Sequence, residues 1–207
     1  MVDSPTSLAQ PVPSIAVVIP IKAFEQAKDR LSGVLTADQR NRLARATALG
    51  VLNSVRGTQV FVICSDQDVS EWAETHGATV VSQSAIGLNA AVQEGISAAR
   101  AYERVMIVHS DLPFPSKLGS LLVSSHSNNS VTIVPDRHHD GTNVLIIPTG
   151  ANFHCHYGAQ SFSAHVTEAN TLGLAIEIIE DDELALDIDT PDDLLVLPTE
   201  WLEQHGL

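Results

Sequence analysis

Short apolar runs alternate with amphipathic stretches along the first half of the chain. The runs cover residues 15–19, 60–64, 79–82 and 104–109. Each has the length of a strand that is buried on both faces of a parallel sheet. The amphipathic stretches, with apolar residues at helical spacing, cover residues 36–55, 68–77 and 88–102. This alternation predicts a doubly wound α/β fold, in which ligands bind beyond the carboxyl ends of the strands.

Capping residues and glycines mark the boundaries of the predicted helices. Thr36 and Gln39 have the spacing of a capping box, so the first helix is expected to begin there and to end before Gly57. The second helix follows Ser65 and Asp66 and is expected to be capped near Asp68 and to close at Gly77. The loops after the first, third and fourth strands should then meet at one edge of the sheet.

The second half of the chain has a different pattern. Residues 131–135 and 143–148 are apolar runs separated by a polar turn with Asp140 and Gly141 at its tight point, which predicts a hairpin. The other expected elements are a helix at 116–125, a helix from about 161, a strand at 175–179 and a helix that starts at 190–191. We therefore expect a mostly parallel sheet with a β-hairpin excursion in the second half.

Composition indicates a folded chain with one sizeable core. Of the 207 residues, 44% are hydrophobic and 17% are charged, and this size is typical of a single domain, expected over residues 14–207. Residues 1–13 are rich in Ser, Thr, Gln and Pro and are expected to form a disordered tail. The tail lacks the features of a signal peptide, and no apolar run reaches membrane-spanning length, so a cytoplasmic protein is expected.

Positive charge is concentrated in one part of an acidic chain. The formal net charge is −14, yet seven of the eleven Lys and Arg residues lie between Lys22 and Arg56. Such a charge balance argues against nucleic acid as a partner and is compatible with small anions at a focused pocket. Lys22, Lys28 and Arg30 follow the first strand and form a candidate phosphate site, with a solvated helix start as the alternative.

Carboxylates follow two other strand-like segments. Asp111 comes directly after the run at residues 104–109, where its side chain would face the ligand edge and suit Mg²⁺. The alternative for Asp111 is a cap of the turn that follows. Asp187 and Asp189 alternate along the chain and would share one face, so either is a candidate second ligand, with Asp189 favoured. Helix N-terminal charge is the alternative role for these two acids.

Histidines and cysteines give weaker signals. His154 and His156 flank Cys155, but an isolated H-x-H on a loop is more typical of exposed residues than of a metal site. Cys64 and Cys155 do not form a disulfide framework or a metal-type pair, so both are expected to be inert thiols.

A helix start near Ser161 is a second candidate anion site. Ser161 is expected to be the helix N-cap, and Gly158 just before it allows a close approach of the backbone. The first amide groups of such a helix are available to a phosphate or a carboxylate.

Six motifs, in this order, resemble the 2-phospho-L-lactate guanylyltransferase family, and the resemblance covers nearly all of the chain after the tail. They are P-x-K-x(5)-K-x-R-L at 20–31, G-L-N-x-A at 87–91, S-D-L-P at 110–113, D-G-T-N-V-L at 140–145, Y-G-x-x-S-F-x-x-H at 157–165 and D-I-D-T-P-D-D-L at 187–194. The resemblance implies a Rossmann-like nucleotidyltransferase fold of the glycosyltransferase-A type. It also implies transfer of guanylyl from GTP to the phosphate of a small phosphorylated carboxylic acid, with release of pyrophosphate, in the biosynthesis of coenzyme F-420.

The resemblance also assigns roles to individual residues. Asp111 and Asp189 match magnesium-binding aspartates. The positions that hold the acceptor match Thr142, Gly158 and Ser161. The cationic loop at the GTP phosphates matches Lys22 and Lys28, and the loop that faces the nucleotide matches Gly87, Leu88 and Asn89. Lys22, Lys28, Arg30 and Asp111 are the expected catalytic residues.

Several properties stay open at the level of sequence. The acceptor implied by the resemblance is 2-phospho-L-lactate, phosphoenolpyruvate or 3-phosphoglycerate. Guanine would be read by Asn89 or by backbone groups near residues 83–87, and a homodimer is compatible with the sequence. The alternative functions are a nucleotidyltransferase of the same fold that uses CTP or a sugar phosphate, and a non-catalytic GTP-binding protein.

Overall fold

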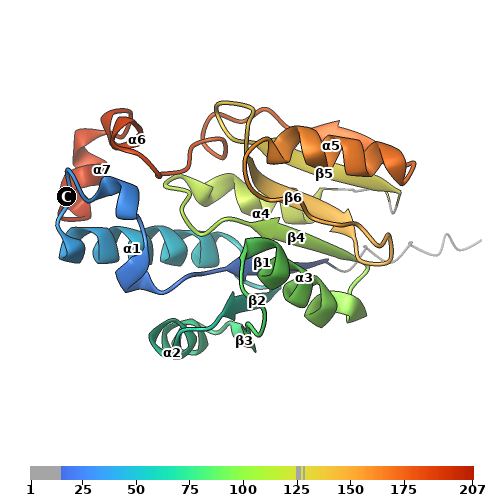
Figure 1. Cartoon of the computed structure of the whole chain (residues 1–207), viewed down its shortest axis with the longest axis horizontal. Coiled ribbons are helices and arrows are strands. Elements are labelled where there is room, and N and C mark those ends of the chain that lie inside the picture. The colour runs from blue at the N-terminus through green and yellow to red at the C-terminus, as the bar shows by residue number, and fades with distance from the viewer. Residues whose placement is uncertain (1–14, 125–126, 128) are drawn as a thin grey trace, which may run out of the picture.

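The centre of the molecule is a mixed β-sheet with a switch in strand order. A computed structural model describes residues 15–124, 127 and 129–207, so the tail predicted at 1–13 lies outside the described residues. The seven described strands have the order β3-β2-β1-β4-β6-β5-β7 (Figure 1). They are β1 (Ile15–Pro20), β2 (Gln59–Cys64), β3 (Thr79–Ser82), β4 (Arg104–Val108), β5 (Ser130–Pro135), β6 (Thr142–Pro148) and β7 (Ala175–Ile178). The order reverses between β1 and β4, and ligands of doubly wound sheets bind at such a switch point.

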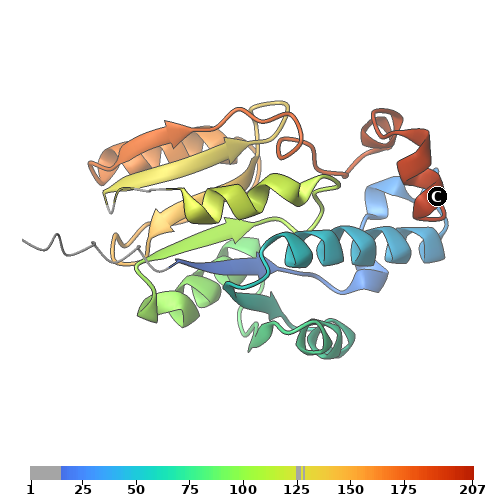
Figure 2. The same ribbon diagram turned by 180° about the vertical axis from the view of Figure 1, so that it is seen from behind.

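Helices cover both faces of the sheet. One face carries α1 and α4 and the opposite face carries α3 and α5, as Figures 1 and 2 show from the two sides. The α-helices are α1 (Ala37–Ser54), α2 (Gln67–Thr75), α3 (Leu88–Ala98), α4 (Leu118–Val123), α5 (Ser161–Thr171), α6 (Pro191–Leu195) and α7 (Thr199–Gln204). Short 3-10 helices are η1 (Phe24–Gln26), η2 (Asp29–Leu31), η3 (Ala99–Ala101) and η4 (Pro115–Lys117). Within the described part of the chain, no helix combines the length and the apolar character needed to cross a bilayer.

The predicted hairpin is present, and it is built into the sheet. β6 pairs antiparallel with β5 and also with β4, where Met106 lies opposite Ile146. β7 then pairs parallel with β5. Among the described strands only β6 runs against the others, so the sheet is mostly parallel, as predicted.

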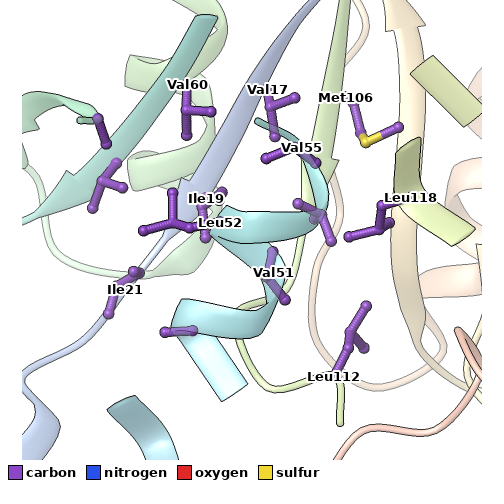
Figure 3. Packing of buried hydrophobic residues seen from close by; sticks show 14 of the residues in the cluster. Val17, Ile19, Ile21, Val51, Leu52, Val55, Val60, Met106, Leu112 and Leu118 are labelled. Carbon is purple, nitrogen blue, oxygen red and sulfur yellow. The ribbon is translucent and has the colours of Figure 1, made fainter. Parts of the chain in front are cut away.

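The core explains why the first apolar run is continuous. Val17 and Ile19 of β1 point to the α1 side, where they pack with Val51, Leu52 and Met106 (Figure 3). The alternate residues of the same strand are buried on the other face, against α3. A strand buried on both sides has no solvent face, so its sequence shows no polar alternation.

The capping signal at the start of α1 is confirmed, whereas the one predicted for α2 needs a correction. The capping box is formed, since the Gln39 amide donates to Thr36 Oγ1 at 3.2 Å and the Thr36 amide donates to Gln39 Oε1 at 3.0 Å. The expected cap of α2 at Asp68 is wrong, because Asp66 accepts from the Val69 amide at 3.0 Å. Asp68 lies in the first turn, and its carboxylate pairs with an arginine of α1 instead.

A separate apolar cluster joins the C-terminal helices to the loop after β1. Its buried members are Leu31, Leu35, Leu43, Leu186, Ile188 and Leu197, and side chains of α7 pack against it. The sequence patterns did not predict α7. Leu186 and Ile188 enter the cluster from an extended segment, so the alternate residues of that segment are directed away from it.

Candidate active site at the carboxyl ends of the strands

The loops after β1, β3 and β4 meet around one cavity, as the alternation of strands and helices predicts. The cavity has a volume of about 720 Å³. Its lining includes seven of the residues predicted to be functional: Lys22, Lys28, Arg30, Gly87, Leu88, Asp111 and Asp189. Segments far apart in sequence therefore form one candidate site.

Three aspartates gather at one side of this cavity. Asp111 follows β4, whereas Asp187 and Asp189 come from the extended segment before α6. Ligand atoms of all three carboxylates lie within 4.8 Å of one another. The alternation expected for Asp187 and Asp189 is therefore present, and both acids reach Asp111.

Lys28 bridges two of the three carboxylates. Its ammonium nitrogen lies 2.8 Å from Asp111 Oδ2 and 3.2 Å from Asp189 Oδ1, and only 7% of its side chain is exposed. The backbone of Lys28 is left-handed, with φ 62°, at the entry to η2. Burial works against the charge, but Asp111 and Asp189 outweigh it and raise the pKa of Lys28 above its usual value. Lys28 is thus held as a cation between the acids.

The other two predicted cations have more freedom. Arg30 lies 3.7 Å from Asp189 with 75% of its side chain exposed, and Lys22 is exposed at the rim of the cavity. Both can meet an incoming anion without first leaving a buried pair.

Negative charge in the acid group exceeds what Lys28 can balance. Burial, together with the charges of Asp111 and Asp189, raises the pKa of Asp187 to about 7. Burial also opposes ionisation of Asp111, but the Lys28 ammonium holds the pKa of Asp111 below its usual value. Among the described residues, the buried Asp111 Oδ1 has no hydrogen-bond partner. The group thus offers oxygen ligands of the kind preferred by a hard divalent cation.

The first turn of α6 fixes the direction of Asp189. Asp193 is buried, and its Oδ2 accepts from the amides of Asp189 at 2.9 Å and of Thr190 at 2.5 Å. Its other oxygen accepts at 2.5 Å from Arg137, which lies in the turn between β5 and β6. The Thr190-x-x-Asp193 spacing is a capping-box signal that could have identified Asp193 in the sequence.

The loop between β3 and α3 is braced by its own neighbours. Glu94 of α3 accepts from the amides of Ser84 at 3.1 Å and of Ala85 at 3.2 Å. The Gln83 side chain donates through Nε2 to the carbonyl groups of Ala85 at 2.7 Å and of Gly87 at 3.2 Å. Gly87 has φ 106°, a conformation that favours glycine, and it is the N-cap of α3. Glu94 was not identified from the sequence, because its partners lie ten residues away in a loop.

The residues predicted to hold the acceptor lie next to this cavity and not in its lining. Thr142 begins β6, Ser161 is the first residue of α5, and Gly158 precedes α5 with φ 132°. Ser161 is buried, and its amide donates to the Gly158 carbonyl at 3.2 Å. The expected N-cap at Ser161 is one residue late, because Gln160 occupies that position.

Two histidines connect the acceptor residues to the cavity. His165 Nε2 accepts from the His156 amide at 2.9 Å, so Nδ1 carries the proton and donates to Thr142 Oγ1 at 3.0 Å. His109 lines the cavity, and its ring centroid lies 5.2 Å from that of Tyr157. His109 follows an apolar run just as Asp111 does, and this strand-end signal could have identified it.

A residue that reads a base is expected to line the cavity, but Asn89 does not belong to the lining. Its Oδ1 accepts from the Tyr157 amide at 2.6 Å, and its Nδ2 donates to the Tyr157 carbonyl at 3.0 Å. Both ends of its side-chain amide are therefore engaged with the chain just before Gly158.

The remaining sequence candidates have structural contacts. His154 and His156 lie 3.4 Å and 3.5 Å from the two carboxylate oxygens of Glu168. Cys64 is buried, and burial raises the pKa of Cys155 to about 12, so the Cys155 thiol is not activated.

Sequence comparisons point to one family of enzymes. A family model described as "Guanylyl transferase CofC like" matches residues 15–200. A phosphoenolpyruvate guanylyltransferase of Conexibacter woesei is 39% identical over 191 residues, which cover 87% of this chain and 86% of that protein. A 2-phospho-L-lactate guanylyltransferase of Methanothermobacter thermautotrophicus is 30% identical over 181 residues, which cover 86% of this chain and 81% of that protein.

Solved structures support the fold independently. A putative nucleotide-diphospho-sugar transferase from Desulfovibrio desulfuricans G20 has a TM-score of 0.73 at 19% identity, and the match covers 90% of this chain and 87% of that one. A nucleotidyl transferase from Methanothermobacter has a TM-score of 0.66 at 14% identity, with coverage of 92% and 99%. The sheet and its helices therefore have the architecture of nucleotidyltransferases.

Proposed function

Because the chain belongs to the family of CofC-like guanylyl transferases, we propose that it transfers GMP from GTP to the phosphate of a small phosphorylated carboxylic acid. An oxygen of the acceptor phosphate forms the new bond to the α-phosphorus of GTP. The bond between that phosphorus and the bridging oxygen of the β-phosphate breaks, and pyrophosphate leaves. The observation that carries the proposal is that Asp111 and Asp189, with Asp187 beside them, share one cavity with Lys22, Lys28 and Arg30.

The donor side of the site suits a triphosphate. Lys22 and Arg30 are available cations at the rim of a cavity that is otherwise part of an acidic molecule. The backbone at Gly87 and Leu88 opens α3, and amide groups at a helix start favour anionic groups. We assign the base to the braced loop 83–87, where backbone groups can read its edge.

The acid group fits Mg²⁺. Asp111 offers a buried oxygen without a partner among the described residues, and Asp187 and Asp189 bring further carboxylate oxygens within 4.8 Å. Asp111 and Asp189 would hold the ion, with Asp187 beside them. When bound, Mg²⁺ neutralises phosphate charge and stabilises the leaving pyrophosphate. Lys28 contributes a fixed positive charge at the same carboxylates.

The acceptor side presents neutral hydrogen-bonding groups. Thr142 and Ser161 offer hydroxyl groups, and Gly158 offers its amide, close to the start of α5. The acceptor phosphate is already an anion at neutral pH, so the chain needs no general base. Its main task is to hold two anions in line against their repulsion.

The names of the relatives suggest the acceptor, and the motif resemblance suggests the metabolic setting. Their names specify phosphoenolpyruvate and 2-phospho-L-lactate, and we propose one of these, or 3-phosphoglycerate, as the acceptor. We place the reaction in the biosynthesis of coenzyme F-420, as the motif resemblance implies. Because GTP is held inside cells, we expect the reaction in the cytoplasm.

A product assay tests the proposal. The protein is incubated with Mg²⁺, one of the four nucleoside triphosphates and one of the three acceptors, and products are identified by mass spectrometry. Of the four nucleoside triphosphates, we expect only GTP to give pyrophosphate and a nucleotidylated acid. Preference for CTP, or for a sugar phosphate added as a fourth acceptor, would identify a different nucleotidyltransferase. GTP binding in calorimetry without product from any acceptor would indicate a non-catalytic protein.

The Asp111→Asn variant tests the acid group. The substitution keeps the shape of the side chain and removes a charge from the proposed ion site, so turnover should fall at least about 100-fold while the circular dichroism spectrum is unchanged. Asp192→Asn is the matched control, because Asp192 is exposed in the first turn of α6. Turnover of Asp111→Asn near that of the wild type would remove Asp111 from the mechanism.

A further inference from the structure

We propose that Asn89 is a positioning residue of the acceptor subsite, although it lies at the start of the helix that faces the nucleotide. The proposal rests on the proposed function, because it concerns the order of the turn at residues 156–158 that precedes the acceptor-binding helix. It differs from the role suggested by the G-L-N motif, in which Asn89 contacts the nucleotide.

The contact between Asn89 and Tyr157 uses both ends of the carboxamide. Oδ1 accepts from the Tyr157 amide at 2.6 Å, and Nδ2 donates to the Tyr157 carbonyl at 3.0 Å. A carboxamide is the side-chain group that supplies a donor and an acceptor side by side. An aspartate in this position would keep the first bond and place its second oxygen against a carbonyl oxygen.

The turn that Asn89 holds leads directly into the acceptor residues. His165 accepts from the His156 amide at 2.9 Å, so consecutive amides of the turn are anchored from two different helices. Gly158 follows with φ 132°, and α5 begins three residues later at Ser161. The direction of the Gly158 amide therefore depends on the anchored peptide before it. Loss of Asn89 would free the backbone of Tyr157, and the position of the Gly158 amide would then be less well defined.

The same helix braces the donor side through a different residue. Glu94 accepts from Ser84 Oγ at 2.5 Å and from the amides of Ser84 and Ala85. Helix α3 thus holds the acceptor turn with Asn89 and the base-facing loop with Glu94. The two side chains belong to one rigid element, so their variants provide a matched pair with opposite expected effects.

Steady-state kinetics with each substrate varied in turn test the role of Asn89. For Asn89→Ala we expect the KM for the acceptor to rise about tenfold and the KM for GTP to change less than twofold. For Glu94→Ala we expect the reverse. Asn89→Asp should raise the KM for the acceptor as well, because one of the two bonds is lost. Ser97→Ala, an exposed position further along α3, should match the wild type.

Hydrogen exchange provides a readout that does not depend on activity. In the protein without substrates, Asn89→Ala should increase the exchange rate of amides 156–158 several-fold and leave that of amides 84–85 unchanged. Glu94→Ala should increase the exchange rate of amides 84–85 and leave that of amides 156–158 unchanged. If Asn89→Ala does not fold, Asn89→Asp decides by the same measurement. Unchanged exchange at 156–158, or a rise in KM for GTP alone, would overturn the role of Asn89. Failure of the wild type to form product would refute the proposed function and leave this comparison intact.

Discussion

At the scale of single residues, Lys28 shows how a cation is kept among acids. Its ammonium contacts Asp111 and Asp189 while its side chain is almost fully covered. The sequence indicated a cation close to a strand end, and it indicated acids at two other strand ends. It could not indicate that these groups touch, because the contact joins segments 83 and 161 residues apart.

Replacement of Lys28 should make stability depend on magnesium. In Lys28→Met a non-glycine residue still occupies the left-handed position, so the backbone strain is unchanged. The two acids lose their buried partner, so the free energy of unfolding should fall by about 2 to 3 kcal/mol. Millimolar Mg²⁺ should restore part of this loss and raise the melting temperature of the variant more than that of the wild type. Differential scanning calorimetry with and without Mg²⁺ measures both effects.

Lys117→Met is the control for that experiment. Lys117 pairs with Asp181 at 2.8 Å, but 49% of its side chain is exposed, so its loss should change stability much less than the loss of Lys28. Equal magnesium responses of the two variants would contradict an ion site at Asp111 and Asp189.

His165 should make stability depend on pH. Burial, followed by the nearby His156 and His109, lowers the pKa of His165 from 6.5 to about 4 in the folded protein. The unfolded chain takes up a proton near pH 6.5 while the folded chain does not, so stability is complete above pH 6.5 and is lost as the pH falls towards 4. Between pH 7 and pH 5 this residue should account for about 2 kcal/mol of the loss.

Urea unfolding at the two pH values tests this effect. His165→Gln should lose about 2 kcal/mol less than the wild type between pH 7 and pH 5, because the titrating group is gone. The exposed His76→Gln variant controls for removal of one histidine. Identical pH slopes for wild type and His165→Gln would show that His165 does not stay neutral.

At the scale of elements, α3 lies unusually close to the sheet at Gly95. A methyl group added there would lie 2.5 Å from Val18 Cγ1 and 3.0 Å from Ile63 Cδ1. Gly50 of α1 is different, since the nearest atom to an added methyl is Pro115 Cγ at 3.4 Å. Alanine favours a helix over glycine by about 1 kcal/mol, so packing decides the sign at each position.

Alanine at these two glycines should therefore have opposite effects. Gly95→Ala should lower the free energy of unfolding by about 1 to 3 kcal/mol, because β1 and β2 cannot retreat within the core. Gly50→Ala should raise it by up to about 1 kcal/mol. Urea titrations of both variants measure the difference, and a stabilised Gly95→Ala would mean that α3 can shift away from the sheet.

Most elements followed from local patterns, and the errors have physical causes. The continuous apolar runs identified the buried strands, and Thr36 with Gln39 identified the start of α1. The cap of α2 was predicted near Asp68, although Asp66 is an equally suitable capping residue. Which of the two caps the helix depends on where β2 ends. The incorporation of β6 next to β4 is a long-range pairing that no local pattern encodes.

At the scale of the whole molecule, charge is distributed unevenly. The chain carries −14 overall, whereas Lys22, Lys28 and Arg30 line one cavity. Doubly wound topology explains why loops from three strands could be assigned to one edge before their contacts were known. Contacts within the site, such as Asn89 with Tyr157, depend on how α3 and the turn before α5 pack together, and the sequence carries no signal for that.

Salt should stabilise the protein. Self-repulsion of a strongly negative molecule is screened as the Debye length falls from about 30 Å to about 8 Å between low and physiological ionic strength. We expect the melting temperature to rise by about 2 to 4 °C, which corresponds to about 1 kcal/mol for a chain of this size. NaCl and NaBr at matched ionic strength should give the same rise, and a fall in either salt would show that attractive pairs dominate.

The hold of Asp193 on the chain at Asp189 has a consequence for protein engineering. Asp189 lies outside the strands of the described part of the chain, and Asp193 in a helix of five residues accepts a hydrogen bond from its amide. Arg137 in turn secures Asp193 from the β5–β6 turn. A transplant of this centre into another α/β scaffold would therefore have to include that short helix and its arginine together with the acids. If the acids alone were grafted, nothing would fix the position of Asp189.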